Sequence, residues 1–178
     1  MSPDSSNALA SRRLRPLGTI RQLRIAEDIW TRSMEELAAW GRRRWEGLVL
    51  LAGFPGLDGT AYATTCLIPR RGHWGGGVRL QAEELASLTK SLVENDLHLL
   101  AQIHSHPGDF GHSAGDERFA ACYRIGFFSF VVPDFAEKTN LRPEDCYVYE
   151  YEGEWRWREL PREVVEERVR LEAAAVGF

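Results

Sequence analysis

Cysteine is scarce in this sequence, and the residues that are present are far apart. Cys66, Cys122 and Cys146 match neither a disulfide framework nor a cysteine-based metal site in their spacing. Their odd number is typical of reduced thiols, so we expect a cytoplasmic protein. Residues 1–18 are polar, carry three arginines and lack an apolar stretch, so they do not resemble a secretory signal.

Long apolar runs and an excess of basic residues are also missing. No uncharged apolar stretch approaches the roughly 20 residues that a membrane helix needs, so no membrane segment is expected. The formal net charge is -4, which gives no sign of a general affinity for nucleic acid. The glycine-rich stretch at 70–77 lacks the Gly-Lys-Ser/Thr ending of a phosphate-binding loop. The expected partners therefore include neither nucleic acid nor membrane.

The length and composition are those of an ordinary globular domain. The chain has 178 residues, of which 44% are hydrophobic, and this is enough to form a buried core. The polar residues 1–18 predict a loose N-terminal extension. Residues 19–178 then form a single domain.

Two histidines separated by one residue stand at the end of an apolar segment. Residues 97–104 read LHLLAQIH, a run of strand length, and His106 follows closely. Because side chains alternate along a strand, His104 and His106 should point to the same face. Pro107 cannot donate to a ladder and is expected to end the strand. Imidazole nitrogens are preferred zinc ligands, so the pair predicts part of a metal site.

A short glycine-containing loop then leads to the sequence Ser113-Ala-Gly-Asp116. This pattern is typical of a helix start in which Ser113 is the N-cap and Asp116 takes the capping-box position usually held by Glu. Asp116 can also supply the third protein ligand of a catalytic zinc ion, which leaves a fourth position for water. The two interpretations are compatible. The alternative is a surface loop that merely carries the histidines.

The segment from His104 to Asp116 resembles the JAMM (MPN+) metalloprotease family, which includes eukaryotic deubiquitinases and prokaryotic JAB-domain peptidases. The resemblance implies that His104, His106 and Asp116 bind zinc and that the Ser113 hydroxyl lies near the oxyanion. It also implies a catalytic glutamate on an upstream strand. The implied fold, related in architecture to cytidine deaminases, covers about residues 20–160. Deamination itself fits poorly, because no Pro-Cys-x-x-Cys motif is present.

The loop between the second histidine and the serine is one residue shorter than the usual family spacing. In an ungapped comparison the serine and aspartate positions fall on Ala114 and Glu117, and the implied functions are lost or altered. A one-residue gap in the loop, where deletions are tolerated, keeps Ser113 and Asp116 in their mutual register, and we favour it. His112 lies in the same loop. We expect it to line the cleft, and an additional metal ligand is the alternative.

The upstream glutamate has three candidates. Glu46 precedes the apolar run 47–53, which reads as a buried strand, and a carboxylate there is costly to bury unless it is paired or near a metal. Glu35 and Glu36 lie in a segment of helical character, where glutamates are more often solvated. We therefore expect Glu46 to be the catalytic base. The alternative is that Glu46 forms a surface ion pair with the arginines at 42–44.

The other segments follow helical or strand patterns. Helices are expected at residues 24–40, 81–95, 114–124 and 161–172. Strands are expected at residues 47–53, 60–69, 97–104 and 127–133. Residues 146–158 predict an aromatic hairpin around Glu152-Gly153, whose rings we expect to pack against a helix rather than form an exposed binding face. Residues 70–77 predict a flexible loop. This order predicts a mixed α/β fold, a central sheet flanked by helices, as a JAB/MPN domain would have.

The function expected from these residues is that of a zinc metallopeptidase of JAMM isopeptidase type. The resemblance implies cleavage after the C-terminal Gly of a ubiquitin-like protein, in a conjugate or a precursor. In a bacterial source, a ubiquitin-like conjugation or defence system would supply such a partner. Trimming of a sulfur-carrier protein is a second interpretation. An inactive MPN scaffold is a third, and the complete set of ligand-type residues argues against it.

Overall fold

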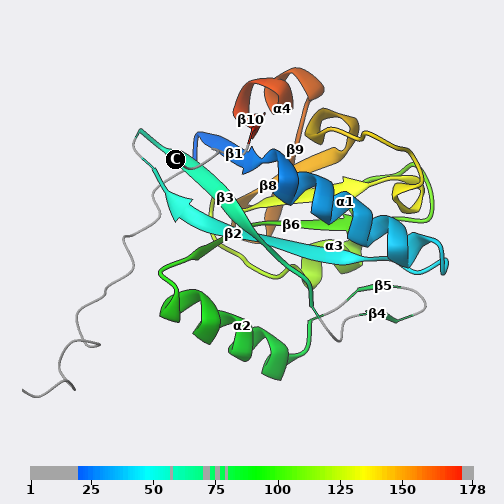
Figure 1. Cartoon of the computed structure of the whole chain (residues 1–178), viewed down its shortest axis with the longest axis horizontal. Coiled ribbons are helices and arrows are strands. Elements are labelled where there is room, and N and C mark those ends of the chain that lie inside the picture. Colours follow the sequence, from blue (N-terminus) through cyan, green and yellow to red (C-terminus); the bar gives the residue numbers. More distant parts are fainter. Residues whose placement is uncertain (1–19, 57, 70–72, 75–76, 79, 174–178) are drawn as a thin grey trace, which may run out of the picture.

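The computed structural model describes residues 20–56, 58–69, 73–74, 77–78 and 80–173. A mixed sheet of eight strands, in the order β10-β1-β3-β2-β6-β7-β8-β9, forms its centre (Figure 1). The strands are β1 (Gln22–Ala26), β2 (Leu48–Pro55), β3 (Thr60–Leu67), β6 (His98–Ser105), β7 (Phe128–Val132), β8 (Tyr147–Gly153), β9 (Arg156–Leu160) and β10 (Val169–Glu172). The pairs β10-β1, β1-β3 and β6-β7 are parallel and the others antiparallel. The expectation of a mixed α/β sheet is confirmed.

Helices cover both faces of this sheet. They are α1 (Glu27–Gly41), α2 (Ala82–Glu94), α3 (Ala114–Arg118) and α4 (Arg162–Arg168), with short 3-10 turns η2 (Asp134–Ala136) and η3 (Pro143–Asp145). Figure 1 shows α1 in front of the sheet and α3 behind it. Within the described ranges, no helix combines the length and apolar character needed to cross a membrane.

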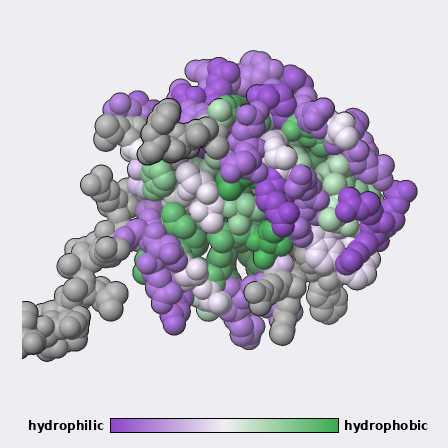
Figure 2. All heavy atoms as spheres, viewed as in Figure 1, coloured by the Kyte–Doolittle hydropathy of each residue, from purple (hydrophilic) through white to green (hydrophobic). Residues whose placement is uncertain are grey.

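The main hydrophobic core lies between the sheet and α1. Trp30 and Leu37 of α1 are buried with Val49 of β2 and Phe130 of β7 in a single cluster. The Trp30 ring meets the Phe130 ring edge-on at 5.7 Å, and its indole N–H donates to the carbonyl of Leu141 at 2.7 Å. Burying large apolar side chains of this kind contributes about 1.5–3 kcal/mol each. Figure 2 shows hydrophobic side chains near the centre of this view and hydrophilic ones around it.

The opposite face of the central strands carries several polar side chains among apolar ones. The register aligns His104 with Leu48 on β2 and with Val131 on β7. Two residues earlier on β6, Gln102 is aligned with Ser129 of β7, which in turn is aligned with Tyr149 of β8. Side chains at aligned positions project to the same face of a sheet. His104 and these polar side chains therefore lie on the face of the sheet that α1 does not cover.

Two of the expected helices include residues that form strands at one edge of the sheet. Residues 24–26, expected to begin a helix, belong to β1, whose burial alternates along the strand. At the C-terminus the expected helix 161–172 ends at Arg168, and the following residues form β10 parallel to β1. The expected helix 114–124 is also too long, because α3 ends at Arg118.

The glycine-rich segment contains two short strands, β4 (His73–Trp74) and β5 (Gly77–Val78), which pair with each other. The rest of that expected loop, and the expected extension at 1–18, lie outside the described residues.

The aromatic hairpin is confirmed, but its turn lies at Glu154-Trp155, two residues beyond the expected Glu152-Gly153, and both turn residues have positive φ. The expected packing against a helix is wrong. Tyr149 and Trp157 contact the His112 ring, which lies in the loop between β6 and α3. A surface of the sheet therefore supports the segment that follows the two histidines.

Candidate metal centre

The two histidines lie at the end of β6 and are buried, with 4% and 2% of their surface exposed. His106 follows the last residue of β6, and its backbone N–H still donates to the carbonyl of Val132 at 2.9 Å. The strand geometry thus continues to His106. For this reason the two imidazole rings share a face, with centroids 4.9 Å apart.

Ser105, between the histidines, fixes the neighbouring strand. Its hydroxyl accepts the backbone N–H of Gly47 at 3.0 Å, and its own N–H donates to the Gly47 carbonyl at 3.1 Å. These bonds hold the backbone that follows Glu46 against the end of β6. We did not anticipate this role from the sequence. The signal was a small hydroxyl residue at the one position of the motif that faces away from the histidines.

Asp116 is brought over the histidines by the short helix α3. Ser113 caps this helix, and its side chain and that of Asp116 form the expected reciprocal capping box. The carboxylate faces both rings, with Oδ1 lying 3.2 Å from Nε2 of His104 and Oδ2 lying 3.2 Å from Nε2 of His106. One ligand atom from each of the three residues lies within 4.8 Å of the others. The three predicted ligands therefore converge.

Burial and the neighbouring charges shift the pKa values of these residues in opposite directions. Burial raises the pKa of Asp116, but the imidazoles of His104 and His106, each 3.2 Å from the carboxylate, outweigh it and hold that pKa well below its usual range. Burial lowers the pKa of His106, yet the bond to Asp116 and the nearby charges raise it overall. The pKa of Glu46 is raised, because burial outweighs the opposing attraction of the two histidines.

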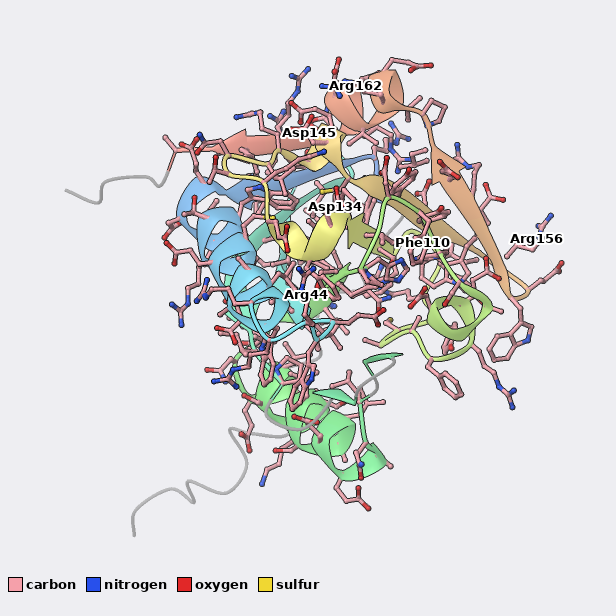
Figure 3. The ribbon with its side chains drawn as sticks, turned by 90° about the vertical axis from the view of Figure 1, so that its right-hand side faces the viewer. Arg44, Phe110, Asp134, Asp145, Arg156 and Arg162 are labelled. Atoms are coloured by element: carbon pink, nitrogen blue, oxygen red, sulfur yellow. The ribbon has the colours of Figure 1, made fainter. Side chains whose placement is uncertain are left out.

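The donor set and its hydrogen bonds fit a metal ion. Nδ1 of His106 lies 3.3 Å from the carbonyl of Phe110 and donates to it, while Nε2 faces Asp116 at 3.2 Å. Figure 3 labels Phe110, which lies in the loop that follows the two histidines. A backbone carbonyl on the far nitrogen is how metal-binding histidines are commonly oriented. Nε2 of His104 is buried and forms no well-directed hydrogen bond, although Asp116 is near. Such an atom is costly to bury unless a ligand satisfies it.

Glu46 is the only one of the three candidate glutamates that lies near these residues. It is half-buried before β2, and the charges of His104, His106 and Asp116 all act on its pKa. The neighbouring arginine run is engaged elsewhere in part, since Arg44 pairs with Glu137 at 3.4 Å. This geometry favours a place for Glu46 at the site over a surface ion pair.

The other two glutamates lie on α1, on the opposite side of the sheet. Glu35 is exposed and lies 3.9 Å from Arg32. Glu36 accepts the indole N–H of Trp40 at 3.0 Å. Neither is positioned to act on a group held by the histidines.

His112 is near the three converging residues but is not one of them. Its Nε2 lies 2.8 Å from the Ser129 hydroxyl, and its ring stacks on Tyr149 with centroids 3.8 Å apart. Burial, reinforced by the charge of His104, lowers the pKa of His112 to about 3. The ring is therefore neutral at physiological pH, and one nitrogen is already engaged.

A probable metalloprotease is similar to this chain over most of its length. No family model matches the chain. The probable metalloprotease y4jG of Sinorhizobium fredii (strain NBRC 101917 / NGR234) is 33% identical over 156 residues, which is 84% of this chain and 93% of that protein.

Two solved structures share the fold. The solution structure of DSY2949 from Desulfitobacterium hafniense has a TM-score of 0.58 and 18% identity, over 85% of this chain and 94% of that one. That of a protein from Salinibacter ruber (strain DSM 13855) has a TM-score of 0.54 and 16% identity, over 87% and 95%. At these identities the likeness concerns the fold alone. The identity to y4jG extends over most of both sequences, and the chain therefore belongs to the family of this probable metalloprotease.

Proposed function

We propose that this protein is a zinc-dependent metallopeptidase of the JAMM isopeptidase type. The observation that carries the proposal is the convergence of His104, His106 and Asp116 within 4.8 Å, with Glu46 near enough that the charges of all three act on its pKa. Two imidazoles and one carboxylate are a ligand set of catalytic zinc sites. Membership in the family of a probable metalloprotease supports the same activity.

Each residue then has a defined chemical role. His104, His106 and Asp116 would hold the ion, which when bound supplies a water whose pKa is lowered to about 7. Glu46, whose pKa is raised by burial, would accept a proton from the attacking water and return it to the leaving amine. The Ser113 hydroxyl would donate to the oxygen of the carbonyl under attack.

As substrate we propose the extended C-terminal tail of a ubiquitin-like protein, cleaved after its terminal Gly. The β4-β5 ribbon supports this choice. It follows β3, which ends at Leu67 opposite Leu50 of β2, at the end of the sheet where β2 begins after Glu46. β4 and β5 pair only with each other among the described residues, which leaves backbone edges beside which a tail can add as a strand. Free thiols at all three cysteines support a cytoplasmic location.

The decisive experiment compares the parent protein with Glu46→Gln. Both are loaded with zinc and incubated with a panel of ubiquitin-like proteins fused through their C-terminal Gly, with and without a chelator. We expect the parent to cleave at least one fusion after this Gly and to lose activity with the chelator. Glu46→Gln should keep its zinc and lose about 10²–10⁴-fold in rate, because an amide cannot carry the proton.

Glu36→Gln is the matched control, since it makes the same change on α1 and should leave the rate unaltered. Cleavage by Glu46→Gln at the parental rate would show that another group is the base. Zinc binding without cleavage of any fusion would favour the inactive scaffold or a different substrate.

A further inference from the structure

A row of polar side chains crosses the middle of the sheet on the face of the site. Gln102 of β6, Ser129 of β7 and Tyr149 of β8 are aligned with one another. They are 4%, 0% and 9% exposed, whereas Leu50, the β2 neighbour of Gln102, is apolar. Burying a polar group without a partner is costly, so a row of this kind needs specific hydrogen bonds.

Those hydrogen bonds converge on His112. The Ser129 hydroxyl lies 2.8 Å from Nε2 of His112, and the Tyr149 hydroxyl accepts the backbone N–H of His112 at 3.1 Å. Ser129 also accepts from the Gln102 amide at 3.0 Å. Its hydroxyl proton is therefore available to Nε2 of His112, which acts as the acceptor.

The same row also holds the chain beyond α3. The side-chain oxygen of Gln102 accepts the backbone N–H of Ala121 at 2.8 Å. The segment that carries Asp116 is thus tied to the sheet on both sides, at His112 before the helix and at Ala121 after it.

The helix α3, which lies between these two attachment points, is too short to hold its own position. α3 has five residues, none of which is buried. A helix of this length has little stability of its own, because nucleation is unfavourable and few bonds follow. What holds Asp116 over the histidines must therefore come from outside the helix. The His112 ring also lies between Tyr149, at 3.8 Å, and His104, at 5.9 Å between centroids.

We propose that His112, anchored by Ser129 and Tyr149, is a positioning residue that sets the geometry and the affinity of the metal site. This rests on the proposed metal ligands His104, His106 and Asp116, and it adds a group outside that set. Losing the anchor frees the loop that carries Asp116 and leaves one face of the His104 ring without support. Groups that orient metal ligands in this way commonly contribute about 10–100-fold to metal affinity.

The test measures metal binding directly and does not depend on any substrate. His112→Phe keeps a ring to stack on Tyr149 but cannot accept from Ser129. His112→Gln can place an amide oxygen near the position of Nε2 and should restore part of the binding. Ser129→Ala removes the donor. The control is Ser33→Ala, which deletes another fully buried hydroxyl, one bonded to Ile29 within α1.

Zinc affinity is measured by chelator competition, and the visible spectrum of the Co²⁺-loaded protein reports the coordination geometry. We expect His112→Phe and Ser129→Ala each to weaken zinc binding about 10–100-fold and to alter the Co²⁺ spectrum. The double variant should be little worse than either single one, because both break the same bond. Ser33→Ala should lower the unfolding temperature and leave both metal readouts unchanged.

Parental zinc affinity and an unaltered Co²⁺ spectrum in His112→Phe would overturn the inference, even if its metal-free form melted at a lower temperature. That result would leave the proposed peptidase intact. A parent protein that binds neither Zn²⁺ nor Co²⁺ would overturn the proposed function and this inference together.

Discussion

Ser113 and Asp116 bind each other in both directions. The backbone N–H of Ser113 donates to the Asp116 carboxylate at 2.6 Å, and the Asp116 backbone N–H donates to the Ser113 hydroxyl oxygen at 3.3 Å. The hydroxyl is an acceptor in this pair, so its proton remains available to another group. One residue can therefore cap α3 and donate to a substrate carbonyl at the same time.

The first prediction separates these two roles of Ser113. Ser113→Ala should slow turnover about 10²–10³-fold, the cost of one lost oxyanion donor in a well-placed site. It should retain zinc, because the ligand atoms are untouched. It should also lose about 1 kcal/mol of stability with the cap. Steady-state rates measured well below the unfolding transition, with metal content and denaturant titrations, distinguish the effects.

Ser113→Gly is the companion variant, because Gly is a tolerable N-cap and costs only a few tenths of a kcal/mol relative to Ser. It lacks the hydroxyl, so it should be as slow as Ser113→Ala while nearly as stable as the parent. A Gly variant with parental turnover would show that Ser113 is only a cap.

The second prediction concerns the pH dependence of metal binding. In the metal-free protein the pKa of His106 is raised above its ordinary value of 6.5, since Asp116 and Glu46 outweigh burial. Protons then compete with the metal at a higher pH than they would for an isolated imidazole. Zinc affinity should fall as the pH is lowered through this raised pKa, with protons released on zinc uptake at about pH 7. Calorimetry in buffers of different ionisation enthalpy counts these protons.

The same shift predicts opposite stability trends with and without metal. A raised pKa in the folded state means that the protonated imidazole stabilises the metal-free fold fully below its unfolded pKa of about 6.5. This contribution is lost as the pH rises through the folded value. Zinc-loaded protein should instead become more stable over that range. A metal-free protein whose stability rose with pH there would contradict the assignment to His106.

Local rules were enough to predict two parts of the site from the sequence. The common face of His104 and His106 follows from strand periodicity, and the cap at Ser113 follows from the Ser-x-x-Asp spacing. The approach of Asp116 to the two rings follows from no local rule, and it was expected from the ligand chemistry of a carboxylate and from the resemblance. It depends on contacts to Ser129 and Tyr149, which lie on strands far along the chain.

The wrong predictions of helix bounds also result from contacts between distant parts of the chain. Residues 24–26 and 169–172 were expected to extend adjacent helices, because their apolar residues fit a helical spacing as well as a strand. They form strands because β1 and β10 pair with each other, and β1 pairs with β3. These partners are remote in sequence, so no local pattern indicates the pairing. The early end of α3 has a similar cause. The chain just after the helix makes a tertiary bond, in which the backbone N–H of Ala121 donates to the side chain of Gln102.

The third prediction tests a buried ion pair that ties the C-terminal region to the sheet. Glu150 of β8 is 7% exposed and accepts from Arg168 at 2.7 and 2.8 Å. Arg168→Met should cost about 3 kcal/mol, because it removes the main partner of a buried carboxylate. Arg158→Met should cost less, because the side chain of Arg158 is 47% exposed and its ion pair is weakened by solvent. Denaturant titrations of both variants measure the difference.

Acid should remove the same contribution in the parent protein. Burial raises the pKa of Glu150, but Arg168 and Arg158 outweigh it and lower the pKa overall. The stabilisation is therefore present above the ordinary glutamate pKa of about 4.3 and is lost as the pH falls through the depressed value. Glu150→Gln should show a flatter loss of stability below this pH. An identical acid transition in the variant would refute the role of the pair.

The last prediction concerns Gly111, which lies against the hydroxyl of Tyr149. A Cβ at position 111 would overlap that oxygen, and the Tyr149 ring cannot move aside because it is buried and stacked on His112. Gly111→Ala should therefore push the loop away from the sheet. We expect weaker zinc binding and a loss of stability of about 1–3 kcal/mol, the range for overpacking a well-packed site.

The double variant Gly111→Ala with Tyr149→Phe identifies the cause of that loss. Removing the hydroxyl creates room for the new methyl group, although it also removes the acceptor of the His112 backbone N–H. The double variant should therefore bind zinc more tightly than Gly111→Ala alone and more weakly than the parent. Gly108→Ala is the control, since a Cβ there meets only the Phe110 ring, at 3.3 Å. If Tyr149→Phe made Gly111→Ala worse, the two changes would act independently, and the close approach of the loop to Tyr149 would not be what limits position 111.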